Sequence, residues 1–233
     1  MPYVLAQISD IHVGGPNIGS GERFSSALSV INDMAQQPDL VLLTGDNTHN
    51  NTEAEWQEVK ERLKVLRAPW VAINGNHDRS IVELAGHRSI QAGPLRLVLL
   101  DTSNDTFTDS DGVWLDTELS IHPDAPTVLA IHQPPFETGI WWMDCVGLKG
   151  SEIFERVVRG HNQVIKVLSG HVHRAIQTNW NGCSLWVCPS TSVPHCSGRP
   201  SARRSPIKEN APDFVAWVRG VQAKRESPFK LEL

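Results

Sequence analysis

The chain has 233 residues, a formal net charge of −5 and 40% hydrophobic residues. This composition supports a folded core and excludes a wholly disordered chain, and the negative charge argues against a protein whose main partner is a nucleic acid. No apolar run approaches the ~20 residues of a membrane helix, and the first residues lack the pattern of a secretion signal, so we expect a soluble, cytoplasmic protein without a membrane partner.

Strand-like and helix-like segments alternate along most of the chain. Buried strands are predicted at six short apolar runs, which are Tyr3–Ile8, Asp39–Leu43, Trp70–Ile73, Leu95–Leu100, Thr127–Ile131 and Val164–Leu168. Apolar residues recur at helical spacing from Phe24 to Met34 and predict a helix there. The capping box formed by Thr52 and Glu55 predicts the start of a second helix, and Ser151–Val158 is expected to form a short third one.

The last third of the chain has a different pattern. Ile176–Trp180 and Cys183–Cys188 flank Asn181-Gly182, a dipeptide that tolerates the positive φ angles of a tight hairpin turn. The segment from Ser197 to Pro212 is expected to be a loop because it is rich in Pro, Ser, Arg and Lys. Two later runs also predict strands, Phe214–Val218 and Phe229–Leu233. Strands separated by helices indicate an α/β sandwich, and we expect one domain over residues 1–233.

The cysteines and several cationic residues are expected to have no role in chemistry. The four cysteines match no compact zinc pattern such as C-x-x-C and are expected to be free thiols, buried or half-exposed; they are Cys145, Cys183, Cys188 and Cys196. A group of cations in the polar loop is expected to be solvated rather than to bind phosphate; it contains Arg199, Arg203, Arg204 and Lys208.

Five segments end an apolar run and then present side chains that can bind a metal. In chain order they are Asp10-Ile11-His12, Gly45-Asp46, Gly75-Asn76-His77-Asp78, His132 and Gly170-His171-Val172-His173. The carboxyl ends of strands are where α/β sheets place ligands, and the glycines permit a sharp turn or a close approach. Two carboxylates, one amide oxygen and four imidazoles are too many for one ion and suit two ions that share a carboxylate. Such mixed ligands favour Mn, Fe, Co, Ni or Zn over Mg or Ca.

In this order, the motifs resemble those of the calcineurin-like metallophosphoesterases, and they extend from Asp10 to His173. The segment that starts at His132-Gln133-Pro134-Pro135 and continues to Gly139-Ile140-Trp141-Trp142-Met143-Asp144 is similar to that of the class III cyclic-nucleotide phosphodiesterases and glycerophosphodiesterases. Two positions depart from the pattern: Asn47 stands where many relatives have an apolar residue, and Gln133 where a second His is frequent. Neither departure replaces a ligand, so both concern the substrate rather than the metals.

The resemblance implies a four-layer αββα sandwich, with the late hairpin and C-terminal strands in its second sheet. It also implies two divalent or trivalent ions, drawn from Fe, Mn, Co and Zn. One ion is assigned to Asp10, His12, Asp46 and His173, and the other to Asp46, Asn76, His132 and His171, with Asp46 bridging. His77 is expected to contact a phosphoryl oxygen or to protonate the leaving group. Asp78 is expected to orient His77 or the loop backbone.

Two ions of this kind can bind a water molecule and activate it for in-line attack on phosphorus. The expected activity is hydrolysis of small phosphodiesters, with 3′,5′-cyclic nucleotides such as cyclic AMP as the best single candidate and a nucleoside monophosphate as the product; the sequence does not rank cyclic AMP, cyclic GMP and 2′,3′-cyclic nucleotides. The alternatives are a glycerophosphodiesterase or a broad phosphomonoesterase. A non-catalytic scaffold is less favoured because every ligand type is present, and a nuclease because the chain is acidic. The expected partner is the small-molecule substrate, and association into a homo-oligomer is left open.

The segment from Pro134 to Asp144 follows His132 directly, and its prolines and Gly139 predict a shaped loop without regular structure. Trp141 and Trp142 have two interpretations: they stack on a nucleotide base, or they pack the loop over the sheet. The resemblance favours the first. Among the remaining histidines, His49 and His195 are candidates for the entrance of the site, and three are expected on the surface, namely His87, His122 and His161.

Overall fold

The predicted apolar runs form strands in the computed structural model, which describes residues 3–16, 19–192 and 216–219. The strands are β1 (Val4–Ile8), β2 (Leu40–Thr44), β3 (Trp70–Ile73), β4 (Arg88–Ala92), β5 (Leu95–Leu99), β6 (Thr127–Ala130), β7 (Val164–Ser169), β8 (Ile176–Trp180), β9 (Cys183–Val187) and β10 (Ala216–Arg219). The helices are α1 (Ser20–Asn32), α2 (Glu53–Leu63), α3 (Asp109–Ile121), α4 (Trp141–Asp144), α5 (Ser151–Arg159) and the 3₁₀ turn η1 (Val82–Leu84). Within these described ranges, no helix is long and apolar enough to cross a membrane.

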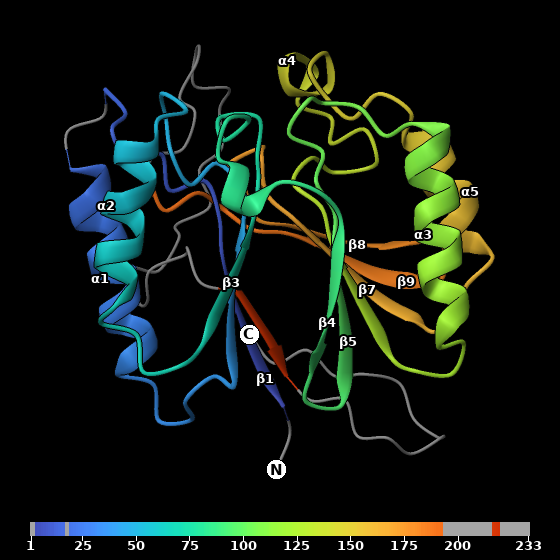
Figure 1. The fold of residues 1–233 in the computed structure, drawn as a ribbon, viewed down its shortest axis with the longest axis horizontal. Helices are drawn as coiled ribbons and strands as arrows, with labels where there is room; N and C mark the ends of the chain where they lie inside the picture. The colour runs from blue at the N-terminus through green and yellow to red at the C-terminus, as the bar shows by residue number, and fades with distance from the viewer. Residues whose placement is uncertain (1–2, 17–18, 193–215, 220–233) are drawn as a thin grey trace, which may run out of the picture.

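The strands form two sheets that stack face to face. The first has the order β10-β1-β2-β3 and the second the order β4-β5-β6-β7-β9-β8. Helices α1 and α2 cover the outer face of the first sheet, and α3 and α5 cover that of the second (Figure 1). The fold is therefore the αββα sandwich that the resemblance implied. Neighbouring central strands are parallel in both sheets, so their carboxyl ends meet at one edge.

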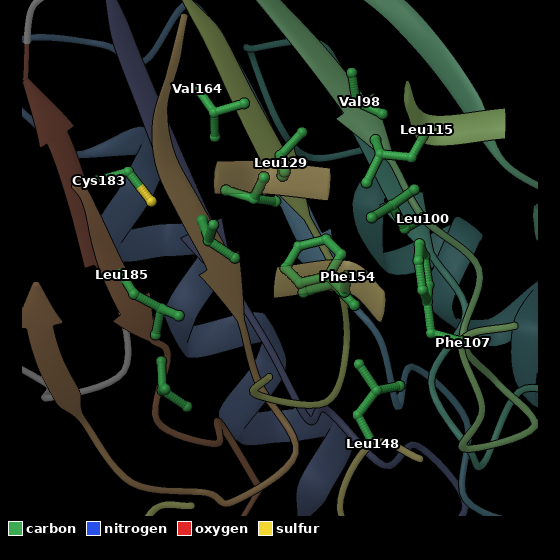
Figure 2. Close-up of a cluster of buried hydrophobic side chains, with 14 of the residues drawn as sticks. Val98, Leu100, Phe107, Leu115, Leu129, Leu148, Phe154, Val164, Cys183 and Leu185 are labelled. Atoms are coloured by element: carbon green, nitrogen blue, oxygen red, sulfur yellow. The ribbon is translucent and has the colours of Figure 1, made fainter. Parts of the chain in front are cut away.

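Three apolar clusters fill the spaces between the four layers. One lies between the first sheet and α1 and α2, one between the two sheets, and one between the second sheet and α3 and α5. Figure 2 shows the last of these, where Phe154 of α5 packs among strand side chains such as Leu129. Because both faces of each sheet are covered, β1, β2 and β5 are buried along their whole length, which explains why each is apolar apart from a single polar residue, namely Gln7, Thr44 and Arg96.

A buried glutamine joins the two sheets close to the carboxyl ends of their strands. The side-chain amide of Gln7 in β1 donates to Thr44 Oγ1 at the end of β2 and to the carbonyl of Ser169 at the end of β7, each at 2.9 Å. Gln7 is fully buried, so losing either acceptor would leave a polar hydrogen without a partner at a cost of about 1–3 kcal/mol. The bridge therefore fixes the first sheet against the second where the loops of the site begin.

The elements β4 and α3 and the three-residue turn η1 were not predicted, and one predicted loop contains a helix. β4 is a half-exposed edge strand with a mixed sequence, and α3 buries few apolar side chains, so neither has the apolar pattern on which the predictions were based. The segment Pro134–Asp144, predicted to lack regular structure, ends in the single turn α4. The strand predicted at Phe214–Val218 is found as β10. Residues 197–212 and 229–233 lie outside the described ranges.

Two histidines expected on the surface are instead half-buried. His87 Nε2 lies 3.0 Å from Asp111 Oδ1, and His161 Nε2 lies 2.9 Å from Asp116 Oδ1. Each ring gains an acidic partner on α3, which explains why it is drawn inward. The third, His122, is exposed as expected. Among the described cysteines, Cys145 is exposed, and Cys183 and Cys188 are buried; Cys196 and His195 lie outside the described ranges.

Candidate metal centre

The predicted ligands lie on loops that leave the carboxyl ends of five strands and are joined by backbone hydrogen bonds. In the first half of the chain, Asp10 N donates to the carbonyl of Gly45 at 3.0 Å and His12 N to that of Asp46 at 2.9 Å. In the second half, Gly170 N donates to the carbonyl of His132 at 2.9 Å. The two halves are joined because His171 N donates to Asp10 Oδ2 at 3.0 Å. The structure thus brings together all seven predicted ligands, which are Asp10, His12, Asp46, Asn76, His132, His171 and His173.

Five of these seven residues have a left-handed backbone. Their φ angles are 53° at Asp10, 50° at His12, 51° at Asp46, 72° at His171 and 57° at His173. Residues other than glycine rarely adopt this conformation, although Asp and His tolerate it better than most. Such strain persists where the surroundings enforce it, and it concentrates at functional sites. The chain therefore bends at each ligand, immediately after its strand ends.

The glycines beside the ligands act in two ways. Gly45 has a φ of +92° and makes the turn that the sequence predicted. Gly75 and Gly170 are needed for space instead, because a Cβ on Gly75 would overlap the carboxylate and backbone N of Asp46. A Cβ on Gly170 would lie 2.6 Å from Asp10 Oδ2. A side chain at either position would therefore displace a ligand carboxylate.

The ligand atoms form two groups that share Asp46. In the first group, His12 Nε2 lies 3.5 Å from Asp46 Oδ2 and 3.1 Å from His173 Nε2, and the latter lies 3.4 Å from Asp10 Oδ1. In the second, His132 Nε2 lies 3.3 Å from the other Asp46 oxygen, Oδ1. Within each group, one ligand atom per residue lies within 4.8 Å of the others. His171 Nδ1 lies 3.1 Å from Asn76 Oδ1 at the edge of the second group.

The electrostatics of these groups fit bound cations. Burial lowers the pKa of His12 and of His171 to about 4, so both rings are neutral at neutral pH, the form that binds metals. Burial also acts to lower the pKa of His132, but Asp46 and Asp10 outweigh it and raise this pKa to about 10. The two carboxylates thus attract positive charge to the ring of His132, and a bound metal ion would take the place of the ring proton.

Buried polar atoms without partners point to the same conclusion. His132 Nε2 and His171 Nε2 are buried and make no hydrogen bond in the structure, an arrangement that costs free energy unless something else satisfies them. His132 Nδ1 donates to the carbonyl of Thr44 at 2.7 Å, which fixes the ring and leaves Nε2 as the ligand atom, as in many metal sites. The residues present therefore fit two metal ions.

Asp78 supports the loops of the first half rather than His77. Its carboxylate accepts hydrogen bonds from the backbone N–H of Asn47, Thr48 and Gly75 at 3.0, 2.8 and 3.0 Å. The side chain of Asn47 also donates to it at 3.0 Å and to the carbonyl of Ile73 at 3.0 Å. Of the two roles expected for Asp78, the structure shows the one on the backbone. The amide of Asn47, a departure from the family pattern, serves the same purpose.

His77 is held by contacts at its backbone and its ring. Its N–H donates to Asp46 Oδ1 at 2.9 Å, and its Nδ1 donates to the carbonyl of His49 at 2.7 Å. The rings of His49 and His77 stack with centroids 5.1 Å apart. His77 is half-buried, and its Nε2 is the ring atom that remains for a substrate. The contact between His49 and His77 joins residues 28 positions apart, and no motif in the sequence predicts it.

A cavity of about 280 Å³ lies beside His171 and is lined by residues of the second half of the chain. Its lining is mixed in polarity and comes mainly from the segment after His132; it includes Phe136, Glu137, Met143, Asp144, Cys145, Leu148 and Lys149. The Asp144 carboxylate shapes this segment by accepting from Thr138 N at 2.8 Å and Gly139 N at 2.9 Å. Trp141 is 73% exposed, whereas Trp142 is half-buried against the apolar cluster between the second sheet and helices α3 and α5.

Gln133, the second departure from the family pattern, has a structural partner on each side. Thr102 Oγ1 donates to Gln133 Oε1 at 2.5 Å, and Gln133 Nε2 donates to Asp105 Oδ1 at 2.8 Å. Gln133 is fully buried. Its amide therefore joins the loop after β6 to the loop after β5 on the cavity side of the site.

Comparisons with known proteins agree with this geometry. A family model described as calcineurin-like phosphoesterase matches residues 3–175. A protein of Arcobacter nitrofigilis named "Probable glycerophosphodiester phosphodiesterase GpdQ" is 31% identical over 214 residues, which cover 81% of this chain and 78% of that protein. A "Probable cyclic nucleotide phosphodiesterase" of a Synechococcus strain is 31% identical over 210 residues, with 83% and 82% covered. The solved structure of a dimetal phosphatase from Danio rerio shares the fold, with a TM-score of 0.66, 15% identity and coverage of 82% and 89%.

Proposed function

This chain belongs to the calcineurin-like phosphoesterase family, and from that premise we propose that it hydrolyses small phosphodiesters, with 3′,5′-cyclic AMP as the preferred substrate. The observation that carries the proposal is Asp46, whose two carboxylate oxygens face separate groups of buried ligands at 3.5 and 3.3 Å. A shared carboxylate of this kind is the arrangement that a pair of metal ions requires.

Each ion of the proposed centre has its own set of ligands. One would be held by Asp10, His12, Asp46 and His173, and the other by Asp46, Asn76, His132 and His171. The mixture of imidazole and carboxylate, without thiolate, favours Mn, Fe, Co or Zn. When bound, such ions supply an activated water molecule as the nucleophile and neutralise the oxygens of the phosphoryl group.

His77 would act on the leaving group. In its protonated form the ring donates from Nδ1 to the His49 carbonyl at 2.7 Å, and the proton on Nε2 is available to the substrate. As the phosphorus–oxygen bond breaks, this proton passes to the departing oxygen and prevents a poor alkoxide leaving group from forming. The hydrogen bond from His77 N–H to Asp46 holds the ring at a fixed position relative to the ligands.

The size and polarity of the neighbouring cavity favour a small diester. It reaches His171, and its apolar residues are accompanied by the charged residues Lys149, Glu137 and Asp144; its size suits the alcohol part of a small diester rather than a polymer. Trp141 is the exposed aromatic ring on the same segment, and we assign it to stacking on the base of a cyclic nucleotide. Trp142 contributes mainly by packing beside it.

A glycerophosphodiester is the second candidate substrate. It is favoured by the relative from Arcobacter nitrofigilis, whose name states that activity and which is as similar to this chain as the cyclic-nucleotide relative. The same ligands and the same His77 would serve either substrate, because the reaction at phosphorus is identical. The two candidates differ in the alcohol group that would occupy the cavity, and only the cyclic nucleotide has a base to stack on Trp141, which lies outside the cavity lining.

A substrate panel tests the proposal. Apo-protein is prepared by chelation, reconstituted separately with Mn, Fe or Zn, and assayed on cyclic AMP, a glycerophosphodiester, bis(4-nitrophenyl) phosphate and 4-nitrophenyl phosphate. We expect activity to require metal, to favour diesters over the monoester and to have the highest kcat/KM with cyclic AMP. A higher kcat/KM with the glycerophosphodiester would select the second candidate, and metal-independent turnover would overturn the dinuclear mechanism.

A further inference from the structure

His49 joins the loop that carries Asp10 and His12 to the loop that carries His77. Its backbone N–H donates to the carbonyl of Val13 at 3.0 Å, and its own carbonyl accepts from His77 Nδ1 at 2.7 Å. Thr48 and Val13 form a parallel bridge beside this position. The backbone of His49 therefore connects the segment that follows β1 with the segment that follows β3, although the two segments are far apart in the sequence.

The ring of His49 makes two further contacts in the site. Its Nδ1 lies 3.4 Å from Nδ1 of His12, and its plane stacks on His77 with an interplanar angle of 21°. Gly15 makes room for this ring, because a Cβ at residue 15 would lie 3.3 Å from His49 Cγ. His49 thus touches one proposed metal ligand and the proposed proton donor through different parts of the same side chain.

The contact with His12 has a defined polarity. His12 presents Nε2 to Asp46 and His173, and a neutral ring that binds metal through Nε2 carries its proton on Nδ1. That N–H needs an acceptor, which in most metal sites is a carbonyl or a carboxylate. Here the atom within reach is Nδ1 of His49. His49 then carries its own proton on Nε2.

We propose that His49 is a positioning residue, whose Nδ1 orients the ligand His12 while its stacked ring orients His77. The inference deepens the proposed function and rests on the ligand role assigned there to His12. It predicts that two separate properties depend on this one side chain. The first is the affinity for one of the two metal ions, and the second is the rate of the step in which His77 takes part.

Two substitutions separate these roles. His49→Asn places an amide oxygen close to the position of Nδ1 and so retains an acceptor for His12, but it removes the stacked ring. His49→Phe retains a flat ring against His77 but removes the nitrogen. Both keep the carbonyl that accepts from His77. Metal affinity is measured by titrating apo-protein with Zn or Mn against a chelator, and kcat is measured at saturating metal.

We expect opposite effects from the two variants. His49→Phe should lower the affinity for one of the two ions by about 10–100-fold, the usual effect of losing the hydrogen-bond partner of a ligand. His49→Asn should bind both ions with close to wild-type affinity. His49→Asn should lower kcat by a larger factor than His49→Phe does. Thermal melting of both apo-proteins verifies that they fold. If His49→Phe binds both ions as tightly as wild type, or if both variants lose affinity and kcat equally, the positioning role is overturned.

A third variant distinguishes this failure from a failure of the proposed function. His12→Ala should lower the affinity for one ion by at least as much as His49→Phe does. If His12→Ala binds both ions with wild-type affinity, the ligand assignment is wrong and the role of His49 falls with it. If His12→Ala loses one ion and His49→Phe loses none, the metal centre stands and the inference about His49 alone is wrong.

Discussion

The two sheets build their halves of the site in different ways. The first sheet supplies Asp10, Asp46 and the loop of His77; both aspartates are buried, and Asp78 joins the loop of Asp46 to the loop of His77 by hydrogen bonds. The second sheet supplies three histidines and then the segment that follows His132, with its cavity and a tryptophan that is 73% exposed. We therefore expect the ligands of both sheets and His77 to serve the reaction at phosphorus, and the segment after His132 to select the substrate.

The half built by the first sheet, the packed half, has little freedom to change. Asp78 is fully buried and accepts hydrogen bonds from backbone and side-chain donors of Asn47, Thr48 and Gly75. Removing the carboxylate from such a network leaves several donors unsatisfied. The half built by the second sheet, the open half, has fewer constraints of this kind, because Asp144 shapes its loop from within. Substitutions of the ligands in either half should therefore remove the reaction, whereas substitutions in the segment after His132 should change which substrate is used.

The largest effect is expected from Asp46, which both halves share. Asp46→Ala removes the carboxylate that faces both ligand groups and should abolish most metal binding and nearly all turnover, more than the loss of any ligand of one ion alone. Metal content by atomic spectroscopy and kcat/KM are the measurements, with exposed Asp124→Ala as the control. A variant that retains two ions per chain and a normal rate would contradict the dinuclear centre.

The next effect separates the reaction from metal binding within the packed half. His77→Ala should lower kcat by about 10²–10⁴-fold and leave the metal content close to normal, because the ring donates to a carbonyl rather than lying among the ligand groups that share Asp46. The loss should be smaller for a 4-nitrophenyl ester, whose leaving group needs little protonation. Equal losses for good and poor leaving groups would restrict His77 to binding the phosphoryl group.

A smaller effect tests how tightly the first half is packed. Gly75→Ala would place a Cβ against the carboxylate and backbone N of Asp46. Because a displacement of about 1 Å in a catalytic group can cost 10²-fold in rate, we expect a loss of that order in kcat and a lower melting temperature. Gly160→Ala is the matched control, since Gly160 has a φ of −78° at the end of α5. Normal kcat in Gly75→Ala would show that the packed half can adapt.

The sequence predicts the ligands well because each motif directly follows the apolar strand that positions it. Asp46, for example, comes two residues after β2 ends at Thr44, and the strand itself is recognisable as a buried apolar run. The central strands follow from the same signal, whereas the order of the four layers was implied by the resemblance to the family. For these residues, a local pattern and the tertiary position coincide, so the pattern is sufficient.

Other features depend on contacts that no local pattern contains. The importance of His49 arises from meeting His12 and His77, which lie 37 and 28 residues away. The strand β4 is short of apolar residues because it lies at a sheet edge, where one side has no neighbouring strand. Likewise, the sequence permits both interpretations of the tryptophan pair and does not show that the two rings differ in burial. Trp142 packs on the apolar cluster between the second sheet and its helices, and Trp141 is exposed.

The smallest effect, and the sharpest test of the open half, concerns Trp141. An aromatic ring stacked on a base contributes about 1–3 kcal/mol to binding, so Trp141→Ala should raise KM for cyclic AMP by roughly tenfold. The same variant should hardly change the hydrolysis of a small diester without a base, because the ligands and His77 are untouched. Steady-state kinetics on both substrates measure the difference, with thermal melting as a test of folding.

Trp142→Ala is the matched control, because the two rings are neighbours on α4 with centroids 5.9 Å apart but differ in burial. Trp142 packs against the apolar cluster between the second sheet and helices α3 and α5. Its loss should therefore lower the free energy of unfolding by about 1–3 kcal/mol and change the hydrolysis of both substrates to the same extent. If Trp141→Ala also treats the two substrates alike, the exposed ring does not recognise a base. The open half would then give no preference for nucleotides, and the glycerophosphodiester would become the favoured substrate, while the results for Asp46 and His77 would still hold.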